Sequence, residues 1–119
     1  MSQKYKPIGK SVTCQIHAMA ETLNDVAKLQ SLVWTAAIEG GLTPLQITGY
    51  KFNPQGASIM CILAESHISI HTYPEDNTCF VDVFTCGGHN PMKCLNHLNN
   101  KIGGIMVDLL KTERGSVEN

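Results

Sequence analysis

Apolar and polar residues alternate along much of this chain, and the pattern predicts more strands than helices. Six segments carry the strand pattern: 10–19, 42–52, 57–64, 67–73, 78–86 and 105–110. The run over 57–64 is apolar apart from Ser58, which predicts a strand buried on both faces. Proline, glycine and asparagine in 53–56 and 74–77 predict tight turns that reverse the chain.

Two segments carry helical spacing instead. Asn24 can cap the first helix, with Asp25 in its first turn, and the Gly40–Gly41 pair ends it. The second helix is expected to begin at Asn90–Pro91, because proline suits the first helical turn. Residues 1–9 and 111–119 are polar, and we expect them to form a loose lead-in and a polar tail.

Strands joined by tight turns, with only two helices, predict an α+β fold. We expect a two-layer sandwich in which an antiparallel sheet carries both helices on one face. The 119 residues suffice for one domain, and no linker or repeat divides them. The opposite sheet face must contact water or a second subunit. Phe80 and Phe84 share one side of their strand, which favours a second subunit and hence a homodimer.

Composition excludes several classes of protein. Nine Lys and Arg nearly balance ten Asp and Glu, and no segment is a basic patch, so we do not expect a nucleic-acid partner. We find no long apolar run and no signal-peptide pattern, so we expect no membrane association and a cytoplasmic location. The five cysteines are odd in number and widely spaced, which predicts free, mostly buried thiols.

The densest chemistry lies in residues 64–75, which read AESHISIHTYPE. Alternation over 67–73 separates two faces: Ile68, Ile70 and Thr72 on one, and His67, Ser69, His71 and Tyr73 on the other. A half-buried strand with a wet outer face commonly looks this way. A strand also holds polar side chains in the fixed geometry that catalysis needs, so the segment is a candidate site.

A serine beside histidines suggests a nucleophile activated by a base, but no Gly-x-Ser-x-Gly motif supports a serine hydrolase. The alternative is intramolecular. The Ser66 hydroxyl can attack the carbonyl of Glu65 and form an ester. Elimination, with a nearby histidine taking the serine α-proton, would then leave dehydroalanine and finally a pyruvoyl group. That carbonyl can form a Schiff base with an amine substrate and accept electrons.

Residues 64–75, together with FNPQGAS at 52–58 and VDVFTCG at 81–87, resemble the pyruvoyl-dependent S-adenosylmethionine decarboxylases of bacteria and archaea. The resemblance is tight over 50–88 and looser outside. It implies cleavage between Glu65 and Ser66 into a β chain, 1–65, and an α chain, 66–119, headed by pyruvate made from Ser66. It further implies decarboxylation of S-adenosylmethionine for spermidine synthesis by a homodimer of cleaved protomers, without pyridoxal phosphate or metal.

The same resemblance implies roles for five more residues. His71 matches the histidine that accepts the α-proton during processing, and Ser58 matches a serine that assists. Cys86 matches the acid that protonates the substrate carbon after carbon dioxide leaves, a role that suits a protonated thiol. Phe52 matches a ring stacked on adenine, because a planar base needs an aromatic face. Glu75 matches the carboxylate that holds the ribose hydroxyls.

The backbone near Ser66 needs a special conformation. Straight alternation puts Ser66 and His71 on opposite faces, so we expect a kink or bulge near Ser66, which strain at the scissile bond would also favour. The first predicted strand departs from the family pattern, since SVTCQIHA stands where members carry a histidine and then acidic residues. A pyruvoyl decarboxylase of arginine or ornithine is therefore the alternative.

Two further interpretations remain. A non-catalytic regulatory paralogue would have no need of Ser66, His71 and Cys86 together, so their presence argues against it. The pairs Cys86-x-x-His89 and Cys94-x-x-His97 resemble a four-ligand zinc site. Only residues 90–93 separate the two pairs, which is shorter than most zinc-finger loops, so we do not expect a metal.

Overall fold

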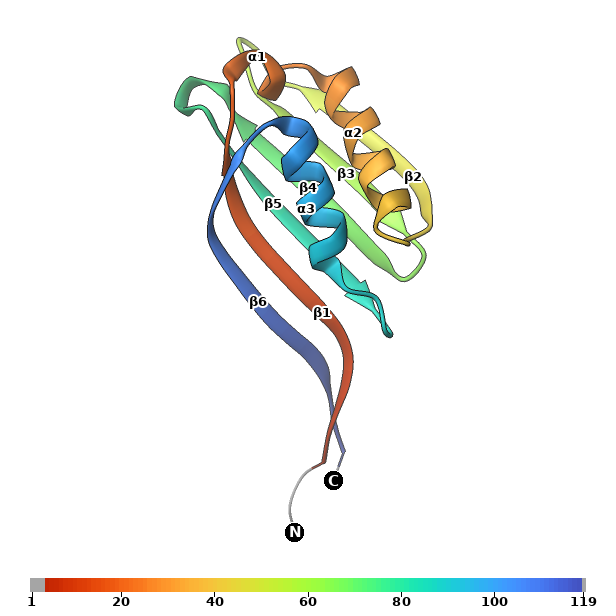
Figure 1. The fold of residues 1–119 in the computed structure, drawn as a ribbon. Coiled ribbons are helices and arrows are strands. Elements are labelled where there is room, and N and C mark those ends of the chain that lie inside the picture. The colour runs from red at the N-terminus through yellow and green to blue at the C-terminus, as the bar shows by residue number, and fades with distance from the viewer. Residues whose placement is uncertain (1–3, 119) are drawn as a thin grey trace.

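A computed structural model describes residues 4–118 as one six-stranded sheet with its helices on one face (Figure 1). The strands run in the order β2-β3-β4-β5-β1-β6, and every neighbouring pair is antiparallel. The strands are β1 (Lys4–His17), β2 (Pro44–Lys51), β3 (Ala57–Leu63), β4 (Ser66–Tyr73), β5 (Thr78–Cys86) and β6 (Ile105–Glu118). The helices are α1 (Ala20–Leu23), α2 (Val26–Glu39) and α3 (Pro91–Ile102), and a 3-10 turn, η1 (Pro74–Asp76), joins β4 to β5. The predicted α+β two-layer fold is confirmed.

The core lies between the sheet and the helices. Alternate strand residues point toward α2 and α3, and the largest fully buried ones include Ile16, Ile59, Ile68, Ile70, Leu29, Leu95 and Leu98. We call the other side of the sheet the open face. The prediction that 57–64 is buried on both faces is wrong, because Met60 is 44% and Ile62 is 52% exposed. The helices cover only one face, so apolar side chains on the open face stay uncovered within one protomer.

The predictions for the two ends of the chain are also wrong where the structure describes them. Residues 4–9 and 111–118 form the outer parts of β1 and β6, which pair from Lys4 opposite Glu118 to His17 opposite Ile105. The sequence did not reveal these strands, because an exposed two-stranded ribbon is as polar as a tail and its two strands are distant in sequence. Residues 1–3 and 119 of the expected lead-in and tail lie outside the described residues.

Helix α2 begins one residue later than expected. Its N-cap is Asp25, whose carboxylate accepts a hydrogen bond from the Lys28 backbone N–H at 3.0 Å. Asn24 instead accepts from the Gly56 N–H at 2.9 Å and ties the start of the helix to the turn before β3. The single turn α1 was not predicted. Helix α3 begins at Pro91 as expected, with the Asn90 side chain accepting from the Met92 N–H.

Candidate active site

The peptide bond between Glu65 and Ser66 lies at a tight turn that joins β3 to β4. Leu63 pairs with Ser66, so only Ala64 and Glu65 form the loop. Glu65 has a φ of 61°, a left-handed conformation that costs a residue other than glycine about 1–3 kcal/mol. The expected bulge is absent from β4, whose described pairings with β3 and β5 show no shift of register. The unusual backbone instead lies at Glu65, on the acyl side of the expected scissile bond.

Cys86 at the end of β5 lies directly beside this bond. Its backbone N–H donates to Ser66 Oγ at 3.2 Å, and the Ser66 hydroxyl lies 3.9 Å from Cys86 Sγ. The thiol in turn donates to Glu65 Oε2 at 3.7 Å. Ser66 and Cys86 are half-buried, so part of each residue contacts solvent. We call Glu65, Ser66 and Cys86 the cleavage half-site; it unites a hydroxyl nucleophile, a proton donor and a strained peptide.

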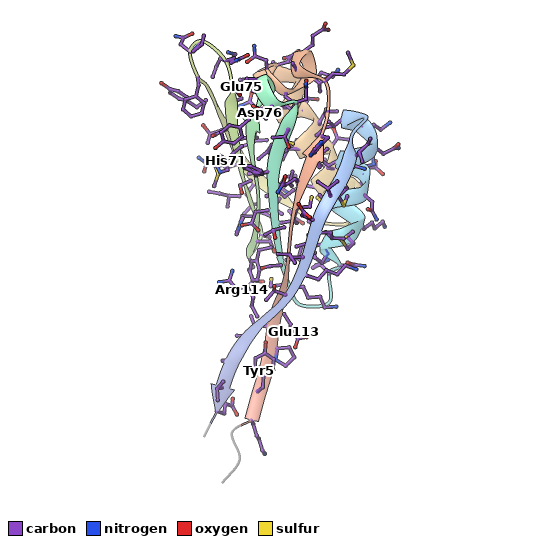
Figure 2. The ribbon with its side chains drawn as sticks, turned by 90° about the vertical axis from the view of Figure 1, so that its left-hand side faces the viewer. Tyr5, His71, Glu75, Asp76, Glu113 and Arg114 are labelled. Atoms are coloured by element: carbon purple, nitrogen blue, oxygen red, sulfur yellow. The ribbon has the colours of Figure 1, made fainter. Side chains whose placement is uncertain are left out.

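A second cluster lies at the other end of β4. Ser58 and His71 are paired residues of β3 and β4, and Ser58 Oγ lies 2.7 Å from His71 Nδ1. A neutral imidazole has one donor and one acceptor nitrogen, so whichever role Nδ1 takes toward the Ser58 hydroxyl, the remote nitrogen takes the other. Phe52 and Glu75 line the same groove, whose volume is about 390 Å³. We call Phe52, Ser58, His71 and Glu75 the histidine half-site; Figure 2 shows His71 and Glu75 toward the same end of the sheet.

The two half-sites are separated along β4. His71 lies five residues after Ser66, which corresponds to about 16 Å at the rise of an extended strand. Hydrogen bonds reach only about 3 Å, so His71 cannot take a proton from Ser66 of the same protomer. The structure therefore brings Ser58 to His71 and Ser66 to Cys86, but it does not join these two pairs within one chain.

The sequence of this chain is similar to that of a known protein family. The family model described as S-adenosylmethionine decarboxylase matches residues 10–115. The chain belongs to this family. It is 36% identical over 115 residues to an S-adenosylmethionine decarboxylase proenzyme of Moorella thermoacetica, covering 95% of this chain and 92% of that protein. Identity to the proenzyme of a Synechococcus species is 41% over 97 residues, covering 80% and 76%.

A solved structure agrees with the sequence relatives. The adenosylmethionine decarboxylase of Aquifex aeolicus superposes with a TM-score of 0.84 at 30% identity, and the match covers 95% of each chain. Both the fold and the family expected from residues 50–88 are thus confirmed. Roles of individual residues within the family site are argued below from the geometry of this chain.

The remaining cysteines are unlike Cys86. Cys14, Cys61, Cys79 and Cys94 are buried, as predicted. Burial raises the pKa of the thiols of Cys14 to about 11 and of Cys79 and Cys94 to about 12, and it also raises the pKa of Cys61. Such thiols are poor nucleophiles and proton donors at neutral pH.

The zinc interpretation fails on placement. Cys94 points from α3 into the core, whereas Cys86 lies on the opposite face of the sheet. Within residues 4–118 no group of three or more His, Cys, Asp or Glu side chains is arranged to hold a metal ion.

In the same part of the chain, no helix is both long and apolar enough to cross a membrane.

Sequence reasoning missed one charged residue near the cleavage half-site. The Arg114 guanidinium carbon lies 5.3 Å from the centroid of the Phe84 ring, and the His67 ring lies 6.0 Å from the same centroid. Arg114 pairs with Gly9, and Gly9 pairs with Cys86, so β6, β1 and β5 form one continuous row here. Reading 111–119 as a tail concealed this residue, because no local pattern links β6 to β1.

Proposed function

We propose that this chain is made as a precursor, cuts itself between Glu65 and Ser66, and then decarboxylates S-adenosylmethionine. The observation that carries the proposal is the contact of Ser66 Oγ with Cys86 beside the left-handed Glu65. The product would be the aminopropyl donor for spermidine. Family relatives that carry the name proenzyme support a processing step.

The self-cleavage uses the chain's own atoms. Ser66 Oγ attacks the carbonyl carbon of Glu65, the C–N bond breaks, and residue 66 gains a free amine while an ester joins the fragments. Removal of the Ser66 α-proton by a histidine then expels the Glu65 carboxylate, which becomes the end of the 1–65 fragment. The dehydroalanine left behind tautomerises to an imine, and water releases ammonia to leave a pyruvoyl group at the start of 66–119.

The surrounding residues suit such a group. A pyruvoyl group supplies an electrophilic carbonyl that withdraws electrons from an amine substrate, which weakens the bond to the substrate's carboxyl group. The Cys86 thiol is held between Glu65 and residue 66, where it can donate a proton to the carbon that loses carbon dioxide. Phe52 is 45% exposed and can stack on adenine, while the Glu75 carboxylate can accept hydrogen bonds from ribose hydroxyls.

We also propose that the active unit is a symmetric homodimer with two composite sites. Ser66 is the first residue of β4, and its hydroxyl accepts from the backbone N–H of Cys86, so it lies at the level of the sheet beside a residue of the open face. If two open faces meet about a two-fold axis that crosses the strands at the middle of β4, each cleavage half-site faces the partner's histidine half-site. The separation of Ser66 from His71 supports this arrangement, since one protomer alone holds no complete site. The same packing would cover the exposed apolar residues Met60, Ile62 and Phe80.

Intact mass spectrometry of the denatured protein tests the cleavage. We expect two fragments that divide between Glu65 and Ser66, with the second lacking an amine terminus and carrying the pyruvoyl mass. The Ser66→Ala variant should remain one chain; if it still divides there, the mechanism is wrong. Native protein that stays uncut would favour a regulatory paralogue. Carbon dioxide release from carboxyl-labelled S-adenosylmethionine, arginine and ornithine then identifies the substrate, and faster release from either amino acid would refute S-adenosylmethionine.

Complementation tests the composite site. Ser66→Ala and His71→Ala chains are co-expressed with different tags. In a mixed dimer, the His71→Ala chain keeps Ser66 and receives the partner's His71, so it should be cut. Random pairing should allow about half of the His71→Ala chains to be cut, while the Ser66→Ala chains stay intact. A site that lies within one chain would leave both variants uncut.

A further inference from the structure

We propose that Arg114 of each protomer enters an acidic hollow on the partner's open face and thereby fixes the alignment of the dimer. This inference rests on the dimer of the proposed function. The hollow has a volume of about 420 Å³, and its lining includes Asp82, Asp108, Gln15 and His71 but no lysine or arginine. Gln15 Nε2 donates to Asp108 Oδ2 at 3.4 Å, so the amide holds one carboxylate at the rim.

The chain presents the Arg114 guanidinium in a defined way. A Cβ at Gly9 would come within 2.6 Å of the Phe84 ring, so glycine there lets the ring lie over β1 and the guanidinium stack on it. Arg114 is exposed, and its guanidinium contacts the Phe84 ring. Figure 2 shows Arg114 and Glu113 leaving β6 on opposite sides, and Glu113 lines a pocket on the helix side. The guanidinium charge is therefore available on the open face.

Strand register indicates what Arg114 would meet. The two-fold axis that brings Ser66 to the partner's His71 crosses β4 between Ile68 and Ser69. Followed across the pairings, the same line crosses β5 between Asp82 and Val83, β1 between Val12 and Thr13, and β6 between Leu110 and Lys111. Arg114 lies opposite Gly9, and β6 carries a bulge between Leu110 and Val107. A half-turn about the axis therefore places Arg114 over the row of the partner's Ile16, next to Gln15, whose amide holds Asp108.

The position of the Phe84 ring, on which the guanidinium stacks, also places Arg114 beside the partner's acidic hollow. The axis passes between Asp82 and Val83 on β5, so Phe84 faces the partner's Val81, the residue next to Asp82. The guanidinium that stacks on Phe84 therefore lies close to both carboxylates of the partner's hollow. Arginine suits such a place, because its planar fork can bond two carboxylate oxygens at once.

The pattern on β6 is self-complementary. Asp108 reaches the open face from a bulge, and Leu110, Thr112 and Arg114 follow it on the regular part of the strand, so the order is acid, apolar, polar and base. Each contact occurs twice in a symmetric dimer, while a slipped dimer would leave both ends without an opposite charge. Since His71 lines the same hollow, seating Arg114 there would hold the partner's histidine half-site against the cleavage half-site.

Charge reversal tests the contact. We expect Arg114→Asp and Asp108→Arg each to weaken the homodimer by about tenfold or more in sedimentation velocity, because like charges then meet twice. An equimolar mixture of the two variants forms heterodimers in which the aspartate introduced at position 114 faces the arginine introduced at position 108. The native pair is kept at the other contact, so the mixture should dimerise within about threefold of the native protein.

Matched controls lie on the same strand. Lys111→Asp and Glu113→Arg reverse charges on the helix side of β6 and should leave dimerisation unchanged. Asp108 has a φ of 53°, so Asp82→Arg serves as a second reversal in a regular strand. Unchanged dimerisation of Arg114→Asp would overturn the inference. A mixture that dimerises no more tightly than its separate components would also overturn it.

The complementation experiment separates the two proposals, because it uses native charges. If Ser66→Ala and His71→Ala chains complement while the charge variants dimerise normally, only the role of Arg114 is wrong. If they do not complement, the composite site is wrong and the Arg114 contact falls with it.

Discussion

The two half-sites lie on the same strand, yet the backbone builds them differently. The cleavage half-site depends on a two-residue turn with Glu65 in a left-handed conformation. The histidine half-site lies on an unbroken ladder, where Ser58 and His71 are simple register partners. The proposed chain cleavage thus lies where the backbone is strained. The groups proposed to take the Ser66 α-proton and to hold the substrate lie where the strand pairing is regular.

The largest test of this difference removes the proton-transfer group from each half-site. His71→Ala should slow self-cleavage by about 10²–10⁴-fold, the usual value of a general base. Cys86→Ala should still cleave at least in part, because its thiol acts later, but release carbon dioxide by a similar factor more slowly. Gel time courses and carbon dioxide release measure the two steps. His67→Ala is the matched control that removes another imidazole, and it should cleave. If His71→Ala and Cys86→Ala lose the same step, the two half-sites do not have separate roles.

The next effect concerns ligand binding at the histidine half-site. Phe52→Leu should raise the KM for S-adenosylmethionine by about tenfold, because stacking on a base contributes about 1–3 kcal/mol. Cleavage should be unaffected. Tyr50→Leu is the control, since that ring lies 4.9 Å from Phe52 but does not line the groove. An equal rise of KM in both variants would show that the aromatic pair supports the loop and does not bind adenine.

A smaller effect tests whether backbone strain at Glu65 promotes cleavage. Glu65→Ala and Glu65→Gly both remove the carboxylate beside Cys86, but only glycine relaxes the left-handed backbone. In a Ser66→Ala background that cannot cleave, the Glu65→Gly variant should have a free energy of unfolding in urea about 1 kcal/mol higher than the Glu65→Ala variant. With Ser66 present, we expect the glycine variant to cleave about fivefold more slowly. Equal cleavage rates would mean that strain at Glu65 does not drive scission.

The smallest effect comes from outside both half-sites. Burial raises the pKa of the Cys14 thiol to about 11 and that of the Cys79 thiol to about 12, whereas the thiols of the unfolded chain have a pKa near 9. Above pH 9 the unfolded state therefore holds fewer protons than the folded state, and stability falls as pH rises. Between pH 9 and 9.5 each thiol should remove a few tenths of a kcal/mol in urea unfolding. Cys79→Ala should reduce this slope, and an unchanged slope would contradict the assignment.

The sequence predicted the local features well, because they depend on neighbours in the chain. Alternation placed Ile68, Ile70 and Thr72 inward and His71 outward, and residues 52–86 contained both half-sites. The errors arose where the contacting residues are distant in the chain or, in the proposed dimer, belong to the second copy. The ends of β1 and β6 looked like tails because each pairs with the far end of the chain.

Two further misreadings have the same origin. β3 looked buried on both faces because Met60 and Ile62 are apolar on a face that a single protomer leaves uncovered. The distance from Ser66 to His71 was hidden because both residues fall within one short motif. A motif records which groups take part but not which subunit supplies them.

The strand order has a consequence for how the molecule is made. The proposed cleavage after Glu65 would leave β1, β2 and β3 on one fragment and β4, β5 and β6 on the other. In the sheet, β1 lies between β5 and β6, so the two fragments would be interleaved and would stay together after the bond is cut. Before such a cut, folding is a unimolecular event. Afterwards an unfolded molecule would have to reassemble from two chains at a rate that depends on concentration, so the native fold would be reached efficiently only once, on the intact precursor.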